Sequence, residues 1–303
     1  MIVVFGGNGQ LGQELARAAA QRAIPMATSP EVDVDIANSS AVATILSRIK
    51  ATLIVNAAAY TNVDLAETNV EEAFRANEFG AAVLARACAA AQLPMVHVST
   101  DYVFDGTKDN AYLETDSVCP INTYGRTKAA GEQAVRGNIK RHVIVRTAWL
   151  YSEFAHNFLK TILRLAADRD ELRVVADQRG TPTSARELAE AILRIAPRLA
   201  SQKLASQKQV WGTYHFTAGG VTTWHGFATR IVSAQAPITG RNPRVTAITT
   251  ADYPLPARRP PNSELDCSSF ARVFGFSGQH WTEGVDMTTK ALVASSQRPA
   301  HVS

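Results

Sequence analysis

The stretch "MIVVFGGNGQLGQELARAAAQR" at residues 1–22 decides the fold. Its first five residues form an apolar, largely β-branched run of the kind found in buried parallel strands. Gly6, Gly9 and Gly12 follow at a spacing of three, and strong helix formers continue from there. Such glycines allow a tight turn, the approach of backbone N–H groups to a pyrophosphate and close packing of the helix on the strand. The stretch therefore predicts the opening βαβ unit of a dinucleotide-binding domain.

The alternation of strand and helix repeats along the first half of the chain. Further buried strands are expected at residues 51–60, 94–100 and 141–151, with helices at 71–92 and 121–136. Short links between alternating strands and helices predict an α/β fold, a doubly wound parallel sheet of the Rossmann type with helices on both faces.

After residue 150 the pattern becomes less regular. Amphipathic helices are expected at 157–169 and 184–199, and a duplicated unit at 199–209 predicts an exposed loop. We expect a dinucleotide-binding Rossmann domain at 1–150. A smaller, interleaved C-terminal substrate domain is expected at 151–303, with some of its segments returning to the Rossmann core.

The composition excludes several classes of function. The 303 residues are 46% hydrophobic and 19% charged, and the net charge of +4 is spread without a dense basic stripe, so we expect no nucleic-acid partner. No apolar stretch approaches the ~18 residues of a membrane span, so we expect no membrane partner. Three cysteines without CxxC spacing and seven histidines without an HxxxH pair argue against a disulfide framework and a metal site. We expect a cytoplasmic protein.

Tyr124 and Lys128 stand four residues apart and would share one face of the predicted helix at 121–136. A phenol titrates near ~10, but a neighbouring ammonium favours the phenolate and would lower the pKa of Tyr124. Thr100 ends the predicted strand at 94–100, at the edge where parallel sheets bind ligands. A Tyr-x-x-x-Lys spacing occurs by chance in many helices. Together with the glycine turn and Thr100, it indicates a carbonyl-reduction site.

The end of the second strand, expected near residues 24–30, carries Thr28 and Ser29 and no acid. An acid at this place usually binds the adenine ribose of NAD. Hydroxyls can bind a ribose hydroxyl or a 2′-phosphate, and a missing carboxylate removes a repulsion against the phosphate. We therefore expect NADPH as the cofactor, with NADH left open.

Seven segments together resemble a known family. They are "GGNGQLG" (6–12), "VNAAAYTNVDLAE" (55–67), "HVSTDYVFDG" (97–106), "NTYGRTKAAGE" (122–132), "RTAWLY" (146–151), "GTPT" (180–183) and "RRPPNSEL" (258–265). From residue 1 to about 290 the chain is similar to the extended short-chain dehydrogenase/reductase superfamily, and most of all to its dTDP-4-dehydrorhamnose reductases. The resemblance implies NADPH-dependent reduction of the C4 ketone of dTDP-4-dehydro-6-deoxy-L-mannose (dTDP-4-dehydro-L-rhamnose) to dTDP-L-rhamnose.

The resemblance also implies roles for single residues. Tyr124 would donate a proton to the C4 oxygen, Lys128 would tune Tyr124 and hold the nicotinamide ribose, and Thr100 would polarise the carbonyl. The residues implied to contact the substrate are Thr100, Asp101, Trp149 and Arg259. The residues implied to contact the cofactor are Gly6, Gly9, Gln10, Leu11, Gly12, Asp35, Ile36, Ala58, Ala59, Tyr60, Thr61, Tyr124 and Lys128.

Dimeric members of the family bind Mg²⁺ between subunits through three glutamates. Glu14 and Glu187 match two of these positions, but the third falls at or near Ala291. Because Mg²⁺ requires near-octahedral oxygen coordination, two carboxylates make a weak site. We expect Glu14 and Glu187 to be ordinary carboxylates on helix surfaces, and leave Mg²⁺ binding and a homodimer open.

Other functions remain open at this stage. One is another NAD(P)-dependent nucleotide-sugar 4-ketoreductase or an epimerase, and an epimerase would retain NAD tightly. A dehydratase of this superfamily needs an Asp-Glu pair directly after the threonine, whereas this chain has Thr100-Asp101-Tyr102. The other is a non-catalytic nucleotide-binding regulatory subunit, against which the intact Thr, Tyr and Lys set argues. Neither the C4 stereochemistry of the product nor the base of the nucleotide follows from the sequence.

Overall fold

The computed structural model describes residues 1–201 and 210–296, so the predicted loop at 199–209 lies, from residue 202 on, outside the described residues. A six-stranded sheet forms the centre of the molecule, and each neighbouring pair of its strands is parallel. In sheet order the strands are β10 (Gly212–His215), β5 (His142–Thr147), β4 (Met95–Thr100), β3 (Leu53–Asn56), β1 (Ile2–Phe5) and β2 (Met26–Ala27).

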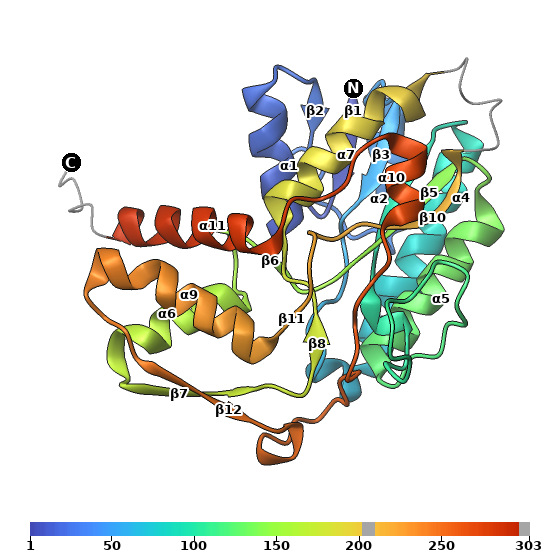
Figure 1. Ribbon diagram of the computed structural model, residues 1–303. Helices are drawn as coiled ribbons and strands as arrows, with labels where there is room; N and C mark the ends of the chain where they lie inside the picture. Colours follow the sequence, from blue (N-terminus) through green and yellow to red (C-terminus); the bar gives the residue numbers. More distant parts are fainter. Residues whose placement is uncertain (202–209, 297–303) are drawn as a thin grey trace.

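Helices cover both faces of this sheet (Figure 1). Along β1, Ile2 and Val4 join one core, whereas Val3 and Phe5 join another, because successive side chains of a strand point to opposite faces. The helices that supply the first core are α1 (Gln10–Gln21), α7 (Ala185–Ala200) and α10 (Ser268–Phe274). The helices that supply the second are α2 (Ser39–Arg48), α4 (Gly80–Ala90) and α5 (Thr123–Asn138). The predicted doubly wound Rossmann-type fold is confirmed.

The chain leaves β1 toward β2 on one side and later adds β3 on the other, so the strand order reverses between β1 and β3. Ligands of open α/β sheets bind at such a reversal, outside the carboxyl ends of the strands. The glycine turn lies at this place. A Cβ at Gly6 would fall 2.4 Å from the backbone N of Ala58, which follows β3.

A second lobe lies beside the sheet (Figure 1), with its own buried core centred on Tyr151 and Phe227. Its helices are α6 (Phe158–Asp168), α9 (Trp224–Thr239) and α11 (Trp281–Ser296). Its paired short strands are β7 (Glu171–Val175) with β12 (Arg244–Ile248), β8 (Arg179–Gly180) with β11 (Thr222–Thr223), and β6 (Leu150–Tyr151) with β9 (Thr183–Ser184). Because α7, β10 and α10 return to the central sheet from this part of the chain, the two halves interleave. The division at residue 150 stays a prediction.

The prediction of one continuous helix at 71–92 is wrong in one detail. It is α3 (Val70–Phe74), a π-helical turn η2 (Arg75–Phe79) and then α4. The buried side chain of Asn77 lies in this turn, where it bonds Tyr60 and Thr127 outside the helix. Shorter 3-10 turns are η1 (Leu65–Glu67), η3 (Asp101–Val103) and η5 (Thr250–Asp252). None of the described helices is long and apolar enough to cross a membrane.

Candidate active site

Thr100, Tyr124 and Lys128 meet at the carboxyl end of β4. Thr100 is the last residue of that strand. Asn122 caps α5 by accepting a hydrogen bond from the backbone N of Gly125 at 2.7 Å, which places Tyr124 in the first turn and Lys128 one turn later. The Lys128 ammonium donates to the carbonyl of Val98 at 2.7 Å, and the Tyr124 ring meets that of Tyr102 edge to face with centroids 5.8 Å apart.

Two glycines allow α5 to lie this close to its neighbours. A Cβ at Gly125 would fall 2.1 Å from the carbonyl oxygen of Tyr102. A Cβ at Gly131 would fall 2.2 Å from the carbonyl oxygen of Asn77. Any side chain at these two positions would push the helix that carries Tyr124 and Lys128 away from the strand ends.

Burial raises the pKa of Tyr124, and the Thr100 hydroxyl lowers it only in part while Asp101 raises it further. The predicted lowering of this pKa by Lys128 is therefore wrong for this structure, since the ammonium is directed to Val98 instead. A phenol with a raised pKa keeps its proton at neutral pH. Tyr124 is thus suited to donate a proton rather than to accept one.

Lys128 is almost completely buried, and burial lowers the pKa of its ammonium to about 8, with Glu132 opposing the shift. An ammonium has three donors, and Val98 uses one of them. The other two can serve a ligand beside Tyr124.

Asp101 is buried next to this group and accepts a hydrogen bond from the Thr100 hydroxyl at 2.8 Å. Burial raises the pKa of Asp101 to about 6, against the lowering effect of Ser263 and Thr100. Its Oδ2 has no hydrogen-bond partner within the described part of the chain. A buried acceptor of this kind suits a ligand that brings its own donor.

The glycine turn leaves room for a dinucleotide. Gly6 has a φ of +86°, and a Cβ at Gly12 would fall 2.3 Å from the carbonyl oxygen of Gly6, so the turn is too tight for side chains. No side chain caps α1 at Gly9, which leaves its first N–H groups for an anion. The buried hydroxyls of Thr28 and Ser29 face this turn and have no partner among the described residues. These groups fit a pyrophosphate and an adenine ribose.

Two of the predicted cofactor residues, Leu11 and Ile36, can offer only backbone groups. The side chains of Leu11 and Ile36 lie in the two cores of the sheet. The Gln10 amide oxygen accepts hydrogen bonds from Ser152 at 3.2 Å and Asn157 at 3.0 Å, which ties the glycine turn to the second lobe.

Asp35 already has partners of its own in this structure. Its carboxylate pairs with Arg75 and accepts a hydrogen bond from the backbone N of Ala37 at 2.9 Å. Both bonds help to lower the pKa of Asp35 against a raising effect of desolvation.

Two asparagines that sequence reasoning missed hold the segment from Ala58 to Thr61. Asn56 ends β3 and accepts a hydrogen bond from the backbone N of Ala58 at 3.1 Å. Asn77 bonds the N–H of Tyr60 at 2.8 Å and its carbonyl at 3.0 Å, and also donates to Thr127 on α5. Ala59 lies between these anchors. The sequence feature that could have identified them is a single polar residue in an apolar or Ala-rich surrounding, Asn56 in the strand β3 and Asn77 before the Ala-rich helix α4.

Arg259 is a partly buried partner of Asp64 rather than a free surface charge. Its two terminal nitrogens bond the two carboxylate oxygens of Asp64 at 2.5 and 2.6 Å, in the bidentate geometry that suits guanidinium. The same carboxylate accepts a hydrogen bond from the backbone N of Ala257 at 3.1 Å. Arg259 also contacts the Tyr102 hydroxyl, so the pair reaches η3 and the site.

Trp149 lies between β5 and β6 with a φ of +48°, a left-handed backbone that bulky residues rarely adopt. Its ring stacks on that of Trp224 at 3.7 Å between centroids and 10° between planes. Gly180 gives it room, since a Cβ there would fall 2.7 Å from the indole. A rigidly held, strained aromatic residue next to a candidate site is typical of ligand-binding positions.

The two candidate metal ligands do not form a metal site. Glu14 is 1% exposed and pairs with Arg17 at 2.6 Å, so the expectation of a helix-surface carboxylate is wrong for it. Glu187 is half-buried and accepts a hydrogen bond from the backbone N of Gln279 at 2.5 Å. Within residues 1–201 and 210–296, no group of three or more His, Cys, Asp or Glu side chains could hold a metal ion.

Residues 1–294 match the family described as the RmlD substrate binding domain. The chain belongs to this family. A dTDP-4-dehydrorhamnose reductase of Sinorhizobium fredii is 42% identical, over 96% of this chain and 97% of that relative. The crystal structure of a dTDP-4-dehydrorhamnose reductase from Clostridium acetobutylicum matches with a TM-score of 0.87 and 35% identity, over 96% of this chain and 99% of the other. That of the Bacillus anthracis enzyme in complex with NADP matches with a TM-score of 0.86 and 32% identity, over 96% and 98% of the two chains. The resemblance described from the sequence is thereby confirmed.

Proposed function

We propose that this protein is a dTDP-4-dehydrorhamnose reductase, which uses NADPH to reduce the C4 ketone of dTDP-4-dehydro-L-rhamnose to dTDP-L-rhamnose. The observation that carries the proposal is the meeting of Thr100, Tyr124 and Lys128 at the carboxyl end of β4, beside a glycine turn that leaves α1 uncapped. Relatives of the same family, matched over nearly the whole chain, carry this name.

The chain's own groups would bind and polarise the ketone. The Tyr124 phenol, protonated at neutral pH, would donate its proton to the C4 oxygen. Thr100 would turn its hydroxyl from Asp101 toward the same oxygen and so polarise the carbonyl. The two free donors of Lys128 would hold the nicotinamide ribose and the phenolic oxygen. When bound, the nicotinamide supplies the hydride.

Cofactor binding would rest on the glycine turn and on Thr28 and Ser29. Gly6, Gly9 and Gly12 would bring backbone N–H groups to the pyrophosphate, and the segment Ala58–Thr61, held by Asn56 and Asn77, would lie along the ribose and nicotinamide. The two orphan hydroxyls at the end of β2, with no carboxylate beside them, favour the 2′-phosphate of NADPH.

Substrate binding would involve Asp101, Trp149 and Arg259. Asp101 offers a buried acceptor oxygen, and Trp149 offers a fixed apolar ring against which a sugar or a base can pack. Arg259 contacts Tyr102 on η3, and its charge suits the diphosphate.

A cytoplasmic location is part of the same proposal, whereas the homodimer stays open. Mg²⁺ is not part of the proposal, because Glu14 is paired with Arg17 and the third glutamate position falls at or near Ala291. Absence of a nucleic-acid partner is proposed from the scattered charge alone.

The test is to mix the purified protein with enzymatically generated dTDP-4-dehydro-L-rhamnose and to follow NADPH oxidation by absorbance, then NADH oxidation under the same conditions. NMR of the product should show dTDP-L-rhamnose. Oxidation of neither cofactor by a folded protein that binds NADPH would contradict the proposal. It would then point to another nucleotide sugar or to a regulatory subunit, and NAD retained through purification would point to an epimerase.

A further inference from the structure

A buried group of charged side chains lies behind the catalytic helix. Glu132, on α5, is completely buried and bonds the guanidinium of Arg146, on β5, through both oxygens at 2.8 and 2.7 Å. Arg146 is only 1% exposed. A second arginine, Arg136, reaches the same carboxylate from the surface at 2.7 Å. Removing two charges from water costs free energy that their attraction often does not offset, so the buried Glu132–Arg146 pair needs an explanation other than stability.

Glu132 stands one helical turn after Lys128, so both side chains lie on the same face of α5. Lys128 is held against β4 by its bond to the Val98 carbonyl, and Glu132 is held against β5 by Arg146. The two strands are neighbours, with Thr100 paired to Thr147. The carboxylate therefore fixes the position of the helix and lies close enough to Lys128 to favour its charged form.

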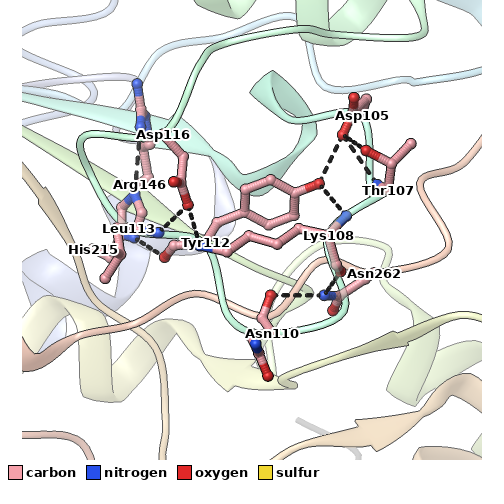
Figure 2. A network of polar contacts seen from close by, with 10 residues as sticks. All are labelled: Asp105, Thr107, Lys108, Asn110, Tyr112, Leu113, Asp116, Arg146, His215 and Asn262. Atoms are coloured by element: carbon pink, nitrogen blue, oxygen red, sulfur yellow. Dashed lines mark hydrogen bonds and ion pairs between the residues drawn. The ribbon is translucent and has the colours of Figure 1, made fainter.

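Arg146 continues the network toward the segment that carries Arg259 (Figure 2). One of its nitrogens bonds His215 Nε2 at 3.4 Å, and His215 Nδ1 donates to the carbonyl of Tyr112 at 3.1 Å. Burial, together with Arg146, lowers the pKa of His215 to about 3, so it stays neutral. Tyr112 in turn bonds the backbone of Glu264, a few residues beyond Arg259. A single chain of contacts thus connects Glu132 with the segment that carries Arg259.

Other groups face this part of α5 from the elements packed on it. His97 on β4 is buried, and its pKa lies well below 6.5, so it carries no charge. Charged side chains of α3, η2 and α4 are exposed. The titratable or charged groups that face the helix among the described residues are Glu67 on η1, His97 on β4, Asp101 and Tyr102 on η3, His142 and Arg146 on β5, and Tyr124, Arg126, Glu132 and Arg136 on α5 itself. Glu132, one turn away on the same face of α5, opposes the effect of burial on the pKa of Lys128.

We propose that Glu132, held by Arg146, is a positioning residue that keeps Lys128 in its charged form and so maintains cofactor binding. The inference deepens the proposed function and rests on it, since it assigns the part that Lys128 plays toward the nicotinamide ribose. The sign follows directly: removing the carboxylate takes away the anion one turn from Lys128 on the same helix face, and a buried ammonium with less counter-charge nearby loses its proton more easily.

The experiment measures the Kd of NADPH from pH 7 to 10, by the fluorescence of the bound nucleotide, for the wild type and for Glu132→Gln. Wild-type affinity should fall above a pH of about 8, where Lys128 loses its proton. The inflection of Glu132→Gln should lie about one pH unit lower. Arg136→Gln is the control, because it removes the exposed arginine that pairs with Glu132 and retains the Glu132 carboxylate. It should not move the inflection to lower pH.

Glu132→Gln leaves Arg146 buried without its partner and can fail to fold, so Glu132→Leu/Arg146→Met is measured in parallel. Replacement of a buried pair by apolar side chains of similar volume is often well tolerated. Because this double variant removes the Arg146 cation together with the anion and leaves apolar side chains, its inflection should lie below that of the wild type by less than for Glu132→Gln.

An unchanged inflection in a folded variant, accompanied only by a lower melting temperature, would overturn the inference and leave Glu132 a purely structural residue. A wild-type protein that binds no NADPH at all would instead overturn the proposed function.

Discussion

Gly131→Ala tests whether α5 is held by close packing against the π turn. A Cβ at Gly131 would lie 2.2 Å from the carbonyl oxygen of Asn77. Carbon and oxygen normally meet at about 3.3 Å or more. Overpacking of this kind costs about 1–3 kcal/mol. We take the upper end, about 3 kcal/mol, because the added Cβ is fixed to the backbone of α5 and the Asn77 carbonyl oxygen belongs to the backbone, so neither atom can move away by side-chain rotation. Replacing Gly by Ala in a helix returns about 1 kcal/mol, so the net loss in the free energy of unfolding is about 2 kcal/mol.

The assay is urea unfolding followed by circular dichroism, together with the KM for NADPH. Displacement of Asn77 loosens its bonds to Tyr60 and Thr127, so the KM should rise by about tenfold. Gly137→Ala is the matched control, because it lies on the same helix, is exposed and has no atom within 4 Å of the added Cβ. The control should gain about 0.5–1 kcal/mol in stability. Equal effects of the two substitutions would refute the packing argument.

Three further predictions concern the site. Tyr124→Phe should keep the Kd of NADPH, because the ring still packs on Tyr102, and should lower kcat by a factor of ~100 or more, because the proton donor is lost. Stopped-flow turnover near that of the wild type would exclude Tyr124 as the proton donor. Thr28→Ala combined with Ser29→Ala should raise the KM for NADPH by about tenfold and leave that for NADH nearly unchanged, which steady-state kinetics with each cofactor measures. The hydrogen bond from Arg259 lowers the pKa of Asp64, so the pair stabilises the protein at pH values above the ordinary carboxyl pKa. This stabilisation disappears as the pH falls through the lowered pKa. Melting temperatures of Asp64→Asn should therefore depend less on pH between about pH 5 and pH 3 than those of the wild type.

The parts of the site that could be predicted are those that depend on local sequence. Gly6, Gly9 and Gly12 specify a turn between a buried strand and a helix, and the spacing of Tyr124 and Lys128 places both on one face of a helix. Asn122 as the cap of α5 is also a local signal. Each of these features needs no more than a few neighbouring residues to be recognised.

The parts that escaped prediction depend on contacts between distant segments. Asp64 and Arg259 lie 195 positions apart, and only the folded chain shows that they form a bidentate pair. The π turn exists because Asn77 bonds Tyr60 and α5 at once, which no periodicity of the helix itself contains. For the same reason, the burial of Glu14 was predicted wrongly from its place on a helix.

The sequence by itself determined the fold class, the dinucleotide turn and the residues that meet at the strand ends, because backbone preference and the period of apolar residues are encoded within each element. Only the tertiary structure decided how the ionisable groups behave. Burial raises the pKa of Tyr124 and lowers that of Lys128 to about 8, whereas spacing alone had suggested that Lys128 would lower the pKa of Tyr124. The physical reason is that desolvation depends on everything packed around a charge, and most of those atoms come from other parts of the chain.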